Sequence, residues 1–76
     1  MSVIEKHFTS QTGTWHIYLL SDYGAHGVSR WIVRAEDHKY SIPRVVDKHF
    51  DTWNEAIRTF DQLEAKVRRY DSGLEA

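Results

Sequence analysis

The chain has 76 residues, with ten Lys and Arg against eleven Asp and Glu, which gives a formal net charge of −1 and a pI near 6.5. This balance excludes the strongly basic character of proteins that coat nucleic acid. The lack of cysteine excludes disulfides, thiolate metal ligands and thiol catalysis. A chain this short buries only about 60% of its unfolded surface. We therefore predict one domain, residues 1–76, whose core depends on large aromatic side chains.

Neither a membrane span nor a secretory leader is expected. No apolar run approaches the roughly 20 residues needed to cross a bilayer. The opening residues, MSVIEKHF, lack the apolar stretch of a secretory signal. We expect a cytoplasmic protein that does not bind membranes.

The first half of the chain predicts strands. Residues Val3–Phe8 are weakly strand-like, whereas Thr14–Leu20 and Val28–Ala35 show the period-two alternation of half-buried strands. Residues 39–43, KYSIP, are expected to resume the extended pattern, with Pro43 at an edge or bulge because it has no N–H to donate. Residues 44–50, RVVDKHF, either extend that strand or form a short further one.

Residues 21–31, SDYGAHGVSRW, place two glycines around His26, between two predicted strands. Glycine-rich phosphate loops lead from a strand into a helix N-terminus, but a strand-like segment follows here. We therefore predict a hairpin connection in which glycine supplies positive φ. Exposed loop tips often carry contacts, which makes Tyr23 and His26 candidate contact residues.

The periodicity becomes helical after residue 50. Thr52 and Glu55 form a capping-box pattern, and Arg68 and Arg69 suit the negative end of the helix dipole. We predict a helix of about 18 residues, followed by a frayed tail at 71–76. Its core-facing stripe consists of Trp53, Ala56, Ile57, Phe60, Leu63, Glu64 and Val67.

Together these elements predict an α+β fold, an antiparallel meander of three or four strands packed on one C-terminal α-helix. The helix stripe should cover one sheet face, made of Trp15, Ile17, Leu19, Trp31 and Val33.

No combination of residues predicts chemistry. The five histidines, at positions 7, 16, 26, 38 and 49, show neither His-x-His nor His-x-x-x-His spacing for a metal. Ser21, Asp22 and His26 are residue types of a nucleophilic triad, but a hairpin tip holds such groups poorly. One sheet and one helix also leave little room for a substrate pocket. We expect a protein that is not an enzyme and has no cofactor.

The other face of the predicted sheet is the candidate partner-binding surface. It collects His16, Tyr18, Arg30, Ile32 and Arg34, a mixture of aromatic, aliphatic and arginine side chains that is enriched at interface centres. Half-solvated sheets usually turn plainly polar residues outward. The alternative is that residues 3–8 or the C-terminal tail fold across this face and cover it.

Two kinds of partner fit such a face. The first is another protein, either a different chain or a second copy that would make a homodimer. The second is single-stranded nucleic acid, with His16 and Tyr18 stacking on bases while Arg30, Arg34 and Lys39 meet phosphates. The near-zero net charge favours the protein.

The segment HFDTWNEAIRTFDQLEAKVRRY, residues 49–70, resembles the last strand and helix of WGR domains, over about a third of the chain. The chain departs from the motif that names that family, because Trp31 is followed by Ile32, Val33 and Arg34. DNA-end binding is therefore not carried over. In size and layout the chain also resembles small cysteine-free proteins of bacteriophages and mobile elements, including anti-CRISPR inhibitors. That resemblance implies an inhibitor or adaptor that occupies a surface on a larger complex.

Overall fold

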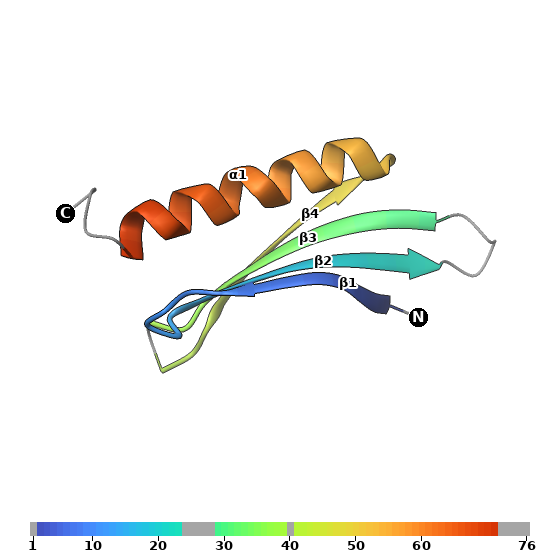
Figure 1. The fold of residues 1–76 in the computed structure, drawn as a ribbon. Helices are drawn as coiled ribbons and strands as arrows, with labels where there is room; N and C mark the ends of the chain where they lie inside the picture. Colours follow the sequence, from blue (N-terminus) through green and yellow to red (C-terminus); the bar gives the residue numbers. More distant parts are fainter. Residues whose placement is uncertain (1, 24–28, 40, 72–76) are drawn as a thin grey trace.

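The computed structural model describes residues 2–23, 29–39 and 41–71. They form four antiparallel strands followed by one helix, which confirms the predicted α+β fold (Figure 1). The elements in chain order are β1 (Ser2–Thr9), β2 (Trp15–Tyr23), β3 (Ser29–Asp37), β4 (Arg44–Phe50) and α1 (Trp53–Asp71).

The strands pair in the order β1-β2-β3-β4, so each one is hydrogen-bonded to its neighbour in the sequence. The registers of β2 with β3 and of β3 with β4 are regular. The register of β1 with β2 shifts between Ile4 and Lys6, which makes a bulge at Glu5. Residues 44–50 form a strand of their own, which decides between the two alternatives for that segment.

The predicted strand at 39–43 is wrong. Lys39 and residues 41–43 form bends and connecting chain between β3 and β4. The backbone N–H of Lys39 donates to Oδ1 of Asp37 at 2.9 Å, a local side-chain bond that turns the chain out of β3. Pro43 then lies directly before β4, where its missing N–H removes no ladder bond.

The helix begins where the capping pattern predicts. The backbone N–H of Glu55 donates to Oγ1 of Thr52 at 3.3 Å, and the N–H of Ala56 donates to the Thr52 carbonyl at 3.3 Å. Arg68 and Arg69 lie in the last turn. No helix in the described ranges combines the length and the apolar character needed to cross a lipid bilayer.

The core lies between α1 and one face of the sheet, as predicted (Figure 1). Phe60 is fully buried there, and Trp53 at the start of α1 meets Trp31 edge-on at a centroid distance of 5.1 Å. The sequence did not assign Phe8, which packs on this core from β1. The buried cluster consists of Ile17, Leu19, Val33, Ala56, Phe60 and Val67.

Candidate functional site

The sheet face opposite α1, here called the open face, carries none of the other described elements (Figure 1). Since Ile17 and Leu19 belong to the core, alternation turns His16 and Tyr18 of β2 to the open face. The register then sets Arg34 opposite Tyr18, Ile32 opposite Leu20 and Arg30 opposite Asp22. The structure therefore brings five predicted contact residues onto one face, namely His16, Tyr18, Arg30, Ile32 and Arg34.

The remaining predictions about this surface have different outcomes. Residues 3–8 do not fold across the open face, because they belong to β1, an edge strand of the same sheet. Tyr23 is the last residue of β2. Its side chain, all of His26 and the tail at 72–76 lie outside the described residues.

The aliphatic side chains that the two central strands turn to the open face are mostly buried. Leu20 and Ile32 form a cross-strand pair and are each 6% exposed, although neither belongs to the core cluster beneath α1. Ile32 therefore offers little area for contact. Arg30 is exposed, and Tyr18 and Arg34 are partly exposed, so these side chains offer the accessible chemistry.

Nearly parallel rings line one end of the open face. His7 of β1 stacks on Tyr18 at a centroid distance of 4.5 Å and an interplanar angle of 2°. His16 lies 5.9 Å from His7 and 6.4 Å from Tyr18, with planes within 12° and 11° of theirs. The pairing of His7 with Tyr18 places both rings on one side of neighbouring strands, where cross-strand aromatic pairs form. The rings therefore turn their faces mainly toward one another along the sheet.

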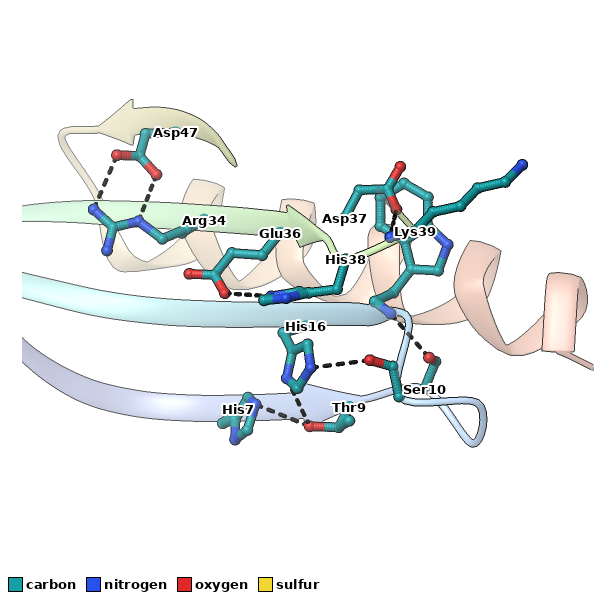
Figure 2. Close-up of polar contacts among 12 residues, drawn as sticks. His7, Thr9, Ser10, His16, Arg34, Glu36, Asp37, His38, Lys39 and Asp47 are labelled. Atoms are coloured by element: carbon teal, nitrogen blue, oxygen red, sulfur yellow. Dashed lines mark hydrogen bonds and ion pairs between the residues drawn. The ribbon is translucent and has the colours of Figure 1, made fainter. Parts of the chain in front are cut away.

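The Thr9 hydroxyl bridges two of these rings (Figure 2). Its Oγ1 lies 3.0 Å from Nε2 of His7 and 3.4 Å from Nδ1 of His16. Nε2 of His16 lies 3.1 Å from the Gly13 carbonyl, which only accepts, so that nitrogen carries a proton. In the neutral ring, Nδ1 of His16 then accepts from Thr9, and His7 donates to Oγ1. The Gly13 carbonyl therefore fixes the tautomer of His16, and the Thr9 hydroxyl in turn fixes that of His7.

A third histidine adjoins the same rings. His38, just after β3, meets His16 edge-on at a centroid distance of 4.7 Å. Its Nε2 donates to Oε1 of Glu36 at 2.9 Å (Figure 2). We call His7, His16, Tyr18 and His38 the ring cluster.

Next to the ring cluster, Arg34 and Asp47 form a two-bond ion pair (Figure 2). Nε of Arg34 donates to Oδ1 at 2.8 Å, and its second terminal nitrogen donates to Oδ2 at 3.1 Å. The hydrogen bond from Arg34 holds the pKa of the Asp47 carboxyl below its ordinary value, against the opposing effect of desolvation. The same bond raises the pKa of Arg34. This geometry fixes the guanidinium plane against β4.

The sequence analysis missed His7, Thr9, Glu36, His38 and Asp47 as members of this surface. A signal existed for Glu36 and Asp47, since strict alternation along β3 and β4 places them on the open face. No local signal existed for His7 and Thr9. Their side depends on the bulge at Glu5, which shifts the register between β1 and β2.

The structure separates Ser21 and Asp22, two of the residues considered for a nucleophilic triad. Ser21 and Asp22 are neighbours in β2 and therefore point to opposite faces. The buried Ser21 hydroxyl donates to Oε1 of Glu5 at 2.8 Å. Within the described ranges, no group of three or more His, Asp or Glu side chains is placed to hold a metal ion.

A shallow apolar groove of about 240 Å³ lies between the second half of α1 and the ends of β2 and β3. Lys66 is the one charged residue in its described lining. The rest of the described lining is aliphatic or aromatic. The groove is formed by Trp15, Ile17, Ala35, Leu63, Lys66, Val67 and Tyr70.

These features define a small α+β domain with one sheet face packed under a helix and one face lined by rings and paired charges. Comparison with protein-family models, with curated proteins and with solved structures gives no match.

Proposed function

We propose that this protein is a non-enzymatic protein-binding module of the inhibitor or adaptor type, which uses its open face to occupy a surface on a larger protein complex. The observation that carries this proposal is that Arg34 and Glu36, two charged residues of the open face, are each bound to a neighbouring side chain. Arg34 binds Asp47, and Glu36 binds His38. A surface that combines balanced charges with aromatic rings is typical of protein interfaces.

The arrangement of the rings supports a protein partner over single-stranded nucleic acid. Bases stack on ring faces that point away from a sheet. Here the faces of His7 and Tyr18 are stacked on each other at 4.5 Å, and the Arg34 guanidinium is bound to a carboxylate. The nucleic-acid alternative depends on Arg30 and Lys39, which are exposed and have no ion-pair partner among the described residues.

The experiment compares affinity capture from the native host by the wild-type protein and by Tyr18→Ala and Arg30→Glu. Both variants alter the open face without touching the core cluster. Arg58→Glu, on the exposed side of α1, is the matched charge control. We expect the captured partner to be lost with both open-face variants and kept with the control. Equal recovery by all four proteins would contradict the proposal.

A labelled oligonucleotide titrated at two salt concentrations tests the alternative. Phosphate contacts make affinity fall steeply as salt rises. We expect no binding at low salt. Salt-sensitive binding that Arg30→Glu abolishes would replace the protein partner with nucleic acid.

A further inference from the structure

The two edges of the sheet are built differently. Strand β1 carries the bulge at Glu5, and a bulge is one of the devices that protect an edge from pairing. Strand β4 is bonded to β3 alone among the described strands, and its register is regular along Arg44–Phe50. All of its residues except Phe50 are exposed. Within the described residues, the β4 edge is therefore a row of backbone donors and acceptors that no bulge interrupts.

Exposed aliphatic side chains accompany this edge. Val45 is 52% exposed and Val46 is 57% exposed, one on each face of the strand, and Ile42 just before it is 80% exposed. A regular edge strand with exposed β-branched residues is a template for a further strand.

The charges along β4 disfavour pairing of this strand with β4 of a second copy of the chain. In an antiparallel dimer about an axis normal to the sheet, facing residues come from the same side of each strand. The register centred on Asp47 sets two Asp47 side chains opposite each other, and the register centred on Lys48 sets two lysines together. The register centred on Val46 sets Lys48 opposite Arg44 twice. Since like charges that face each other destabilise a sheet, each register that keeps most of the strand paired carries a repulsive contact.

We propose that β4 binds an extended segment of a different protein by strand addition, and that this segment carries an acidic-x-aliphatic-x-acidic pattern. On the α1 side of the sheet, β4 presents Arg44, Val46 and Lys48 in alternation. Lys48 has no ionic partner among the described residues. Acidic side chains opposite Lys48 and Arg44, and an aliphatic one opposite Val46, turn the pairs that repel a second copy into attractive ones.

This inference goes beyond the proposed use of the open face, because it concerns the edge of the sheet. The added strand would continue the open face next to Asp47 and His49, which lie on that side of β4. It does not require contact with the ring cluster.

The experiment adds a synthetic peptide of sequence Thr-Glu-Thr-Val-Thr-Glu-Thr to the whole chain. Binding is followed by nuclear magnetic resonance of the backbone amides of the protein. We expect the amide signals of β4 to shift and those of β1 to stay. Two control peptides accompany it, one with lysine in place of glutamate and one with alternate backbone amides N-methylated. Both should bind at least tenfold more weakly. No β4 shifts at about 1 mM acidic peptide, or equal shifts with either control, would overturn the proposal.

Charge reversal at Lys48 gives a second, independent test. Lys48 is exposed, so Lys48→Glu should fold normally. We expect it to bind the acidic peptide about three- to tenfold more weakly and the lysine peptide correspondingly better. Arg58→Glu, the control of equal charge change, should bind as the wild type does. Unchanged peptide preference in Lys48→Glu would contradict the proposal.

Tyr18→Ala separates the two proposals. It should lose the partner of the open face while leaving the β4 shifts unchanged. Failure of strand addition would therefore leave the open-face proposal standing, and the reverse also holds.

Discussion

Arg34 of β3 and Asp47 of β4 face each other across the ladder and are joined by two hydrogen bonds of 2.8 and 3.1 Å. Their side chains are 38% and 32% exposed, so solvent screens the pair and its contribution to stability is small. The pair nevertheless changes what Arg34 can contact on the open face. Asp47 binds the guanidinium that the sequence analysis offered as a phosphate contact. The pair also joins the edge strand β4 to β3 on the open face.

This pair predicts a pH-dependent contribution to stability. Because the folded protein lowers the pKa of Asp47, the contribution is complete above the ordinary pKa of a carboxyl and is lost as the pH falls below that value through the lowered pKa of the folded protein. Near pH 6, we expect Asp47→Asn to lower the free energy of unfolding by less than about 1 kcal/mol. Near pH 2, the two proteins should be equally stable. Urea unfolding at both pH values measures the difference, and an equal gap at the two values would contradict this account.

Packing under α1 predicts a larger loss of unfolding free energy than the ion pair does, confined to buried positions. Ile17 is 1% exposed and Ile42 is 80% exposed, so the same change can be compared inside and outside the core. Ile17→Val should lower the unfolding free energy by about 0.5–1.5 kcal/mol, since removal of a buried methylene leaves a gap. Ile42→Val should change it by less than about 0.5 kcal/mol. Thermal and urea unfolding of both variants provide the measurement. Similar losses at the two sites would mean that Ile42 is covered in solution.

Local sequence patterns predicted the parts of this fold that depend on local physics. Strict alternation placed β2 and β3, and the Thr52 cap placed the start of α1, because each depends on residues close together in the chain. The segment 39–43 was misassigned because the Asp37 side chain bonds the Lys39 backbone and ends the strand. Apolar alternation in KYSIP carries no sign of that competition.

The candidate site was predicted only where it lies on the two central strands. Predicting the ring cluster requires the register of β1, which depends on a bulge that brings Lys6 opposite Leu19. Predicting Asp47 as the partner of Arg34 requires the register between β3 and β4, which the connection after β3 does not reveal. Both are long-range pairings, set by the packing of whole elements and not by spacing within one segment.

The stack of His7 on Tyr18 yields a prediction about how β1 is held to the sheet. The rings lie 4.5 Å apart and nearly parallel, on strands that are also joined near this end by backbone bonds, the packing of Phe8 and the contact of Thr9 with His16. A double-mutant cycle with His7→Ala, Tyr18→Ala and the double variant should give a coupling of about 0.5–1 kcal/mol in unfolding free energy. Thr9→Val, which removes the hydroxyl that orients His7 but keeps the shape, should reduce that coupling. A coupling near zero would mean that the rings are stacked without stabilising each other. The open face would then lack the rigidity that a preformed protein-binding surface requires.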